Sequence, residues 1–292
     1  MIKIILIIMT VFILYCMIET ARELRDFRLT KYRICSPKLN GIRGTKKIIF
    51  LSDLHNRMYG KENERLLESI KNQHPDLILI GGDMLVRKDG NSYDRTVRFL
   101  GKLPAICPVY CANGNHEQKL KELPDKYEQS YEGYKKALTA CGIYMLENAS
   151  ETVRLDEAPV RISGLEIPLR AYARFGKKDL PLKEITDRIG EHGEEYQILF
   201  AHHPGYIQEY LEYGADLILS GHYHGGVMQL PGIGGVISPD FTLFPKYSGG
   251  IYREGTQTVV VSRGLGTHSV PVRLWNWPEL IVLELSGTSE EM

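Results

Sequence analysis

Five short polar clusters each directly follow an apolar run of the sequence. They are Asp53-Leu54-His55, Gly81-Gly82-Asp83, Gly114-Asn115-His116-Glu117, His202-His203-Pro204 and Gly221-His222-Tyr223-His224-Gly225. Six of the nine histidines of the chain lie in these clusters. Because loops past the carboxyl ends of strands are where α/β folds build their sites, we expect the clusters to meet at one edge of a sheet.

The spacing within two clusters suits the binding of an ion. Asp53 and His55 are two residues apart, and so are His222 and His224. At an extended strand end such residues point to the same side, which is the geometry that two ligands of one ion require. The residue between them would face the other way and pack.

The side chains in the clusters predict a metal centre with two ions. Carboxylate, imidazole and one amide oxygen, without thiolate, favour Mn, Fe or Zn over Cu(I) or an iron–sulfur cluster. Two ions roughly 3.5 to 4 Å apart can share a water, lower its pKa and clamp the oxygens of a phosphoryl displacement. Seven ligands suffice for two ions if one carboxylate bridges them: Asp53, His55, Asp83, Asn115, His202, His222 and His224.

Each cluster alone is a weak signal. An Asp-x-His occurs by chance, a Gly-Asp is usually a turn, and paired histidines before proline can be a satisfied core pair. The five together, each at a strand end, favour the metal site. The five cysteines form neither a zinc pattern nor a disulfide framework, and Cys107 and Cys111 are expected to be ordinary buried thiols.

Length and composition predict one globular catalytic domain. The chain has 292 residues, of which 43% are apolar and 25% charged, as in ordinary folded proteins. Lys plus Arg and Asp plus Glu both total 36, so the chain has no overall basic field. Nucleic acid is therefore not expected as a partner.

The order of apolar runs predicts an α/β fold. Strands at 48–52, 77–81 and 106–112 alternate with helices around 62–72 and 93–100. A helix around 127–140 is followed by β runs at 153–154, 160–163, 197–201, 217–220, 258–262 and 280–285, several of them short and joined without helices. This mixture indicates two packed sheets with helices outside.

The N-terminus predicts a membrane anchor. Residues 4–18 are apolar apart from Thr10, and a signal peptidase cut after Ala21 would leave Glu19 at an unsuitable position. We therefore expect an uncleaved single span over 1–20, a tether over 21–45 and a catalytic domain over 46–286, with a signal sequence or a buried helix as alternatives. The positive-inside rule favours a cytoplasmic domain, because one lysine precedes the span and five cations follow it: Arg22, Arg25, Arg28, Lys31 and Arg33.

The five clusters resemble the signature of the calcineurin-like metallophosphoesterase family, which runs Asp-x-His, Gly-Asp, Gly-Asn-His-Asp/Glu, His-x-Pro and Gly-His-x-His. The similarity extends over about 48–285. The glycine-rich run 247–252 and the segment 262–267 are similar to the bacterial YkuE/YaeI-like branch of membrane-associated phosphodiesterases. The resemblance implies a two-sheet αββα sandwich with the metals at one edge.

The resemblance also implies a role for each residue of the clusters. Asp53, His55 and His224 would hold the first ion. Asn115, His202 and His222 would hold the second, and Asp83 would bridge the two. His116 would be catalytic, because the family places it where it stabilises the transition state or protonates the leaving oxygen. His203 and Glu117 would orient ligands.

The expected function is that of a membrane-anchored phosphoesterase. Its substrate would be a phosphodiester, phosphomonoester or pyrophosphate, attacked by a hydroxide that the two ions share, with a lipid precursor as one option. A non-catalytic metal-binding scaffold and a nucleic-acid phosphodiesterase are the alternatives. The presence of His116 argues against the scaffold, and neutral net charge and the membrane span argue against nucleic acid.

Three further features bear on the substrate. Arg263 stands after a strand and before two glycines, which predicts a phosphate clamp. A basic loop carries Arg170, Arg174, Lys177 and Lys178 and reads more simply as a solvated surface. Phe241, Leu243 and Phe244 could touch a bilayer, but we expect them to pack beneath their own loop.

Overall fold

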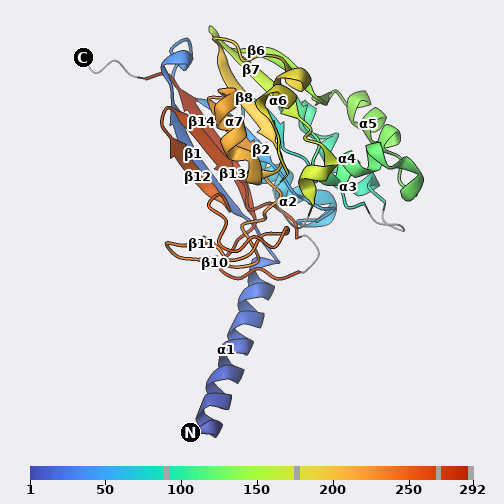
Figure 1. The fold of residues 1–292 in the computed structure, drawn as a ribbon. Coiled ribbons are helices and arrows are strands. Elements are labelled where there is room, and N and C mark those ends of the chain that lie inside the picture. Colours follow the sequence, from blue (N-terminus) through green and yellow to red (C-terminus); the bar gives the residue numbers. More distant parts are fainter. Residues whose placement is uncertain (88–91, 174–177, 268–270, 289–292) are drawn as a thin grey trace.

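The computed structural model describes residues 1–87, 92–173, 178–267 and 271–288. Two six-stranded sheets lie face to face (Figure 1). The first sheet has the strand order β1 (Arg28–Cys35), β14 (Glu279–Ser286), β2 (Lys46–Leu51), β3 (Leu77–Ile80), β4 (Val109–Cys111) and β5 (Tyr144–Met145). Strands β2 to β5 run parallel, so their carboxyl ends share one edge.

The second sheet has the order β12 (Gly250–Glu254), β13 (Gln257–Val261), β9 (Leu217–Ser220), β8 (Tyr196–Ala201), β7 (Ala158–Leu165) and β6 (Ala149–Leu155). Strands β13, β9, β8 and β7 are parallel to one another. A separate two-stranded ribbon joins β10 (Gln229–Leu230) to β11 (Gly234–Gly235).

The sheets bury apolar side chains on both faces. In β2, Ile48 and Phe50 point into the core between the sheets, whereas Ile49 and Leu51 point to the outer layer. Phe50 meets Phe200 of β8 across the core, with ring centroids 6.3 Å apart. Burial on both faces explains why these strands read as continuous apolar runs.

Helices cover the two outer faces. The first sheet packs against α2 (Glu64–Lys71), α3 (Asp94–Leu100) and α5 (Tyr131–Ala140), and the second against α6 (Leu182–Ile189) and α7 (Ile207–Tyr213). Helix α4 (Asn115–Glu122) follows β4 directly. Single 3₁₀ turns are η1 (Pro37–Leu39), η2 (Lys61–Asn63), η3 (Leu103–Ala105), η4 (Pro124–Lys126), η5 (Leu169–Tyr172) and η6 (Pro204–Tyr206). The predicted αββα sandwich is confirmed.

Two parts of the chain differ from expectation. The segment 21–45, expected to be a tether, contains β1, which pairs with β14 from Arg28↔Glu279 to Cys35↔Ser286. The charged residues of β1 made it look unlike a strand in the sequence, because an edge strand carries charged side chains on the side that faces solvent. In the second half, α6 lies between β7 and β8 and α7 between β8 and β9, in a stretch where we had named only β runs.

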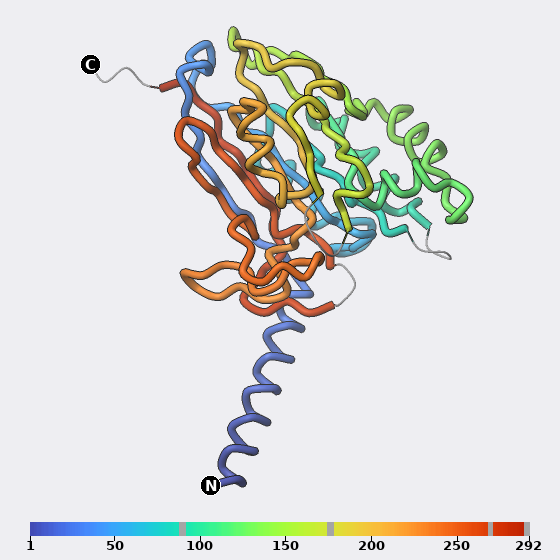
Figure 2. Tube along the Cα trace, in the orientation of Figure 1, coloured from blue at the N-terminus to red at the C-terminus, as the bar shows by residue number. Residues whose placement is uncertain are grey.

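Helix α1 (Ile2–Glu23) extends away from the sandwich (Figures 1 and 2). It is apolar and exposed along most of its length. By length and composition it could cross a membrane, and an N-terminal signal sequence would share these properties. The tube in Figure 2 shows it leaving the body beside the loops that follow β9, at the end opposite the C-terminus.

Candidate metal centre

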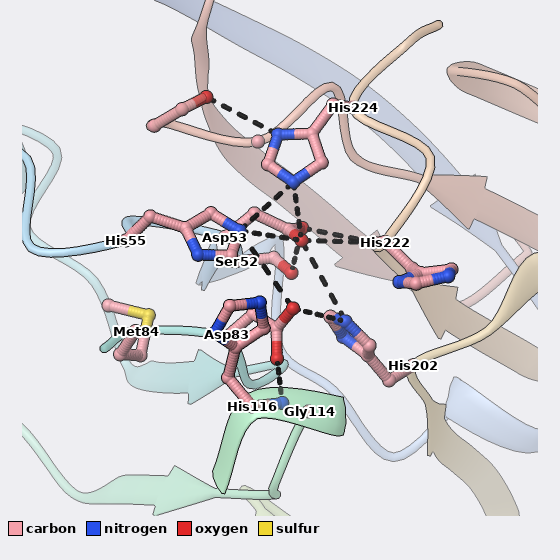
Figure 3. A network of polar contacts seen from close by, with 12 residues as sticks. Ser52, Asp53, His55, Asp83, Met84, Gly114, His116, His202, His222 and His224 are labelled. Atoms are coloured by element: carbon pink, nitrogen blue, oxygen red, sulfur yellow. Dashed lines mark hydrogen bonds and ion pairs between the residues drawn. The ribbon is translucent and has the colours of Figure 1, made fainter. Parts of the chain in front are cut away.

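The predicted ligand residues come together at the carboxyl ends of the parallel strands of both sheets (Figure 3). Strands β2, β3 and β4 deliver them from one sheet, and β8 and β9 from the other. All are buried, and none is more than 8% exposed: Asp53, His55, Asp83, Asn115, His116, His202, His222 and His224. The cluster thus gathers seven possible ligands and His116 away from bulk water.

Asp53 lies at the centre of the first group. Its carboxylate accepts a hydrogen bond from the Ser52 hydroxyl at 2.6 Å and from the His222 backbone N–H at 3.0 Å. The Nε2 atom of His224 lies 3.2 Å from Asp53 Oδ1, and that of His55 lies 3.9 Å from it. The ligand atoms of Asp53, His55 and His224 all lie within 4.8 Å of one another.

Asp83 lies between this group and the second one. Its Oδ1 accepts the backbone N–H of His116 at 2.8 Å. Its Oδ2 faces His202 Nε2 at 3.3 Å and His55 Nε2 at 3.8 Å. Asp83, His202 and His222 form a second group of atoms within 4.8 Å. One carboxylate therefore faces histidines of both groups.

Backbone carbonyls orient two of the imidazoles. His202 Nδ1 lies 2.8 Å from the oxygen of Gly81, and His224 Nδ1 lies 3.3 Å from that of Gly266. In a neutral ring Nδ1–H donates to the carbonyl, which leaves the Nε2 lone pair directed at the aspartates. An imidazole that binds a metal ion through Nε2 needs this tautomer.

The donor set fits divalent cations. The amide oxygen of Asn115 and the Nδ1 atom of His222 are buried and have no hydrogen-bond partner within the described segments. Nε2 of His55 and Nε2 of His224 approach to 3.1 Å, a contact that two neutral acceptor nitrogens do not favour without a cation or proton between them. Carboxylate, imidazole and amide oxygens are the donors that Mn, Fe and Zn accept.

The side chains converge for a reason other than the predicted one. We expected Asp53 and His55 to lie in an extended strand end, but β2 ends at Leu51. Both have left-handed backbone, with φ of 53° and 47°, and so do His222 and His224 at 63° and 50°. Non-glycine residues rarely adopt this region, and such conformations concentrate at functional sites.

Two glycines make room for the aspartates. A Cβ atom at Gly114 would collide with Asp83 Oδ1, and one at Gly221 would collide with Asp53 Oδ2. Both glycines stand directly before a cluster residue in the sequence. Their absence of a side chain lets the loops of different strands approach closely.

His116 lies beside the two groups, at the first turn of α4. Its ring packs edge-on against His55 with centroids 4.8 Å apart. The backbone N–H of Arg87 donates to His116 Nδ1 at 3.2 Å. In the neutral ring the proton is then on Nε2, which makes this atom a hydrogen-bond donor.

Glu117 and His203 contact the loops that carry ligands. The Glu117 carboxylate accepts the backbone N–H groups of Asp83 at 2.9 Å, Met84 at 2.8 Å and Gly114 at 3.1 Å. The ring of His203 packs against that of His222 with centroids 4.6 Å apart. Both residues thus hold neighbours of the cluster in place.

Charges within the cluster shift its pKa values in opposite directions. Burial acts to raise the pKa of Asp53, but the imidazoles of His224 and His202 outweigh it and hold that pKa below its usual range. Burial acts to lower the pKa of His202, yet Asp83 and Asp53 raise it to about 9. Burial and histidine neighbours lower the pKa of His55 and of His222. The two carboxylates therefore create a site for positive charge.

The Arg263 prediction is wrong. Its guanidinium donates to Glu279 Oε2 at 3.0 Å and its backbone N–H to Glu279 Oε1 at 2.9 Å. This pair fixes Arg263 to the start of β14, so the arginine is structural. In the basic loop, Arg170 pairs with Glu184 at 2.6 Å, whereas Arg174 and Lys177 lie outside the described residues.

The sequence did not predict two basic side chains near the cluster, Arg87 and Lys119. A pocket of about 270 Å³ is lined by Asn115, His222 and His224 and also by Arg87 and Lys119. Lys119 is four residues after Asn115 in α4, and the i, i+4 spacing of a helix face was the signal that could have found it. Arg87 carries no comparable signal, because its loop is irregular.

Comparison with known proteins agrees with this geometry. The family description "Calcineurin-like phosphoesterase" matches residues 46–226. The uncharacterized metallophosphoesterase YkuE of Bacillus subtilis is 30% identical over 248 residues, which are 83% of this chain and 80% of YkuE. The phosphodiesterase YaeI of Escherichia coli is 26% identical over 262 residues, which are 89% of this chain and 88% of YaeI. The chain belongs to the calcineurin-like phosphoesterase family.

Proposed function

We propose that the chain is a phosphoesterase with two divalent ions, Mn, Fe or Zn, in the cluster described above. Asp53, His55 and His224 would hold one ion, Asn115, His202 and His222 the other, and Asp83 would contact both. The observation that carries the proposal is that Asp83 Oδ2 faces His55 of the first group at 3.8 Å and His202 of the second group at 3.3 Å, while the ligand atoms within each group lie within 4.8 Å of one another. Bound there, the ions would neutralise phosphoryl oxygens and activate the attacking water.

The chain's own residues supply the rest of the chemistry. Arg87 and Lys119 line the pocket beside Asn115 and would hold the non-bridging oxygens of the substrate. His116 packs against His55, and its Nε2–H would stabilise developing charge or give a proton to the leaving oxygen. Burial of the cluster strengthens each of these interactions.

We further propose that α1 anchors the enzyme in the cell membrane as a single span. Its apolar length supports this assignment, and the cations that follow it favour a cytoplasmic catalytic domain. Protease protection in spheroplasts tests the side. Digestion of the catalytic domain by external protease would show that it lies on the outer side of the membrane.

A metal analysis joined to an activity assay tests the function. The purified chain should contain two divalent ions and hydrolyse a generic aryl phosphodiester. Metal without hydrolysis would make the chain a binding scaffold, and hydrolysis without metal would refute the proposed centre.

A further inference from the structure

Exposed apolar side chains border the mouth of the pocket. Val227, Phe241 and Val272 line the pocket and are 39%, 52% and 39% exposed. Leu243 and Phe244 extend this patch along the loop after Phe241, and they are 64% and 55% exposed. With Trp275 these residues form what we call the apolar rim: Val227, Phe241, Leu243, Phe244, Val272 and Trp275.

Contrary to our expectation, Leu243 and Phe244 do not pack beneath their own loop, because more than half of each side chain is exposed. The three aromatic residues of the rim have left-handed backbone, with φ of 64° at Phe241, 49° at Phe244 and 54° at Trp275. Bulky residues seldom occupy this region, and exposing apolar side chains such as Leu243 and Phe244 to water gains the fold nothing. The rim therefore has the properties of a contact surface for something outside the chain.

Helix α1 is fastened to the same face. The Thr20 hydroxyl donates to the carbonyl oxygen of Arg273 at 2.9 Å, and the Asn276 backbone N–H donates to the Glu23 carboxylate at 3.0 Å. These contacts join the end of α1 to the segment that carries Val272 and Trp275. Figure 1 shows α1 emerging beside the loops of this region.

The contact between Tyr15 and Trp275 sets the depth of the rim. Trp275 Nε1 donates to the Tyr15 hydroxyl at 3.1 Å. Tyr15 precedes the end of α1 by eight residues, or roughly 12 Å of helix. The whole helix is roughly 33 Å long, close to the hydrocarbon thickness of about 30 Å. If the apolar part of α1, which ends at Ile18, spans a bilayer, Tyr15 lies near the end of the span, and Trp275 beside it lies at the membrane interface.

The residue types agree with that depth. Tyr15 and Trp275 are of the kinds that gather at membrane interfaces. Farther along the chain, the guanidinium groups of Arg22 and Arg28 lie 5.2 and 4.3 Å from the ring of Trp277. Arginines at this level can reach phospholipid headgroups while their stems stay on an apolar surface.

We propose that the apolar rim inserts into the bilayer that holds α1 and that the substrate is a phosphate ester of a membrane lipid. The inference rests on the proposed hydrolase and anchor. Metal ligands, Arg87 and Lys119 line the pocket together with the exposed apolar residues Val227, Phe241 and Val272, which matches an amphiphile with its phosphate at the ligands and its chains along the rim. Hydrolysis would add one water across the P–O ester bond and release an alcohol and a phosphate.

A matched pair of substrates tests the inference on the full-length chain in phosphatidylcholine vesicles. Nitrophenyl dodecyl phosphate and nitrophenyl ethyl phosphate release the same leaving group and differ in chain length alone. The wild type should prefer the dodecyl ester in kcat/KM by about 10-fold or more, because the chain is buried against the rim. The variant L243Q/F244N should lose this preference and still hydrolyse the ethyl ester normally.

The controls separate the possible failures. Tyr144 is 58% exposed on β5, at the sheet edge opposite β1, and Y144Q should keep the dodecyl preference. If the wild type hydrolyses neither ester, the proposed function fails. If it hydrolyses both equally, or if L243Q/F244N keeps the preference, the rim inference fails and the hydrolase stands.

Fluorescence quenching tests insertion independently of activity. With Trp275 and Trp277 replaced by Phe, Phe244→Trp should be quenched by lipids brominated on the acyl chain, and Tyr144→Trp in the same background should not. Equal quenching at both positions, or none at Phe244→Trp, would overturn insertion of the rim.

Discussion

The backbone N–H of Asn276 donates to both carboxylate oxygens of Glu23, at 3.1 and 3.0 Å. The side-chain amide of Asn276 also donates to the carbonyl oxygen of His224 at 2.7 Å. One asparagine thus joins the last turn of α1 to the loop that carries a proposed metal ligand. The end of the apolar helix is packed into the catalytic domain.

Truncation should reveal this junction. Deleting residues 1–18 should release a soluble, active domain, because the apolar part of α1 makes few contacts with it. Deleting residues 1–23 should lower the free energy of unfolding by a further ~1–3 kcal/mol, since the buried Asn276 N–H loses its acceptor, the Glu23 carboxylate. Urea denaturation in detergent-free buffer measures both. Failure of the shorter deletion to fold without detergent would refute the anchor.

Arginine and lysine substitutions should separate substrate binding from structure. Arg87→Ala and Lys119→Ala should each raise KM for an aryl phosphodiester several-fold, because these cations line the pocket. Arg263→Ala should leave KM unchanged and lower the melting temperature, because Glu279 would stay buried without its partner. A raised KM in the Arg263 variant, with unchanged stability, would support the prediction that Arg263 binds phosphate.

The sequence predicted the sandwich because strands such as β2 are buried on both faces and read as continuous apolar runs. Strand β1 escaped prediction because its pairing with β14 depends on a partner about 250 residues away and its exposed side carries charges. Local propensity does not report such long-range pairing.

Residue types and spacing predicted that the five clusters meet, but they did not predict the geometry of the side chains there. The left-handed backbone at Asp53 and His222 follows from tertiary contacts, such as the hydrogen bond between them. The role of Arg263 was misjudged because its partner Glu279 is distant in sequence. The position of the rim depends on where α1 docks, which its uniform apolar sequence does not specify.

Metal binding should release a proton. Asp83 and Asp53 raise the pKa of His202 to about 9, so the metal-free chain carries a proton there at neutral pH. A ligand imidazole must lose it. Apparent metal affinity should therefore fall about 10-fold for each pH unit below 9. Calorimetry in two buffers of different ionisation enthalpy measures the release, and identical heats in both would contradict it.

His116→Ala should impair turnover without affecting the metals. We expect kcat and kcat/KM to fall together by on the order of 10² to 10⁴, because Nε2–H would act only as charge develops on the reacting oxygens. A nitrophenyl ester should suffer less than an alkyl ester if His116 donates a proton, and equal losses would favour charge stabilisation. Metal analysis is the control. Loss of an ion in this variant would make His116 a ligand.

Titration of the metal-free chain with Mn²⁺ tests the dinuclear centre most directly, with hydrolysis of an aryl phosphodiester followed at each addition. Activity should be negligible with one ion per chain and should saturate at two, because both groups of ligands must be filled around Asp83. Asp83→Asn, titrated in parallel, should show no turnover, since an amide bridges two dications poorly. Full activity with a single ion per chain, or near-normal turnover by Asp83→Asn with two bound ions, would contradict the account.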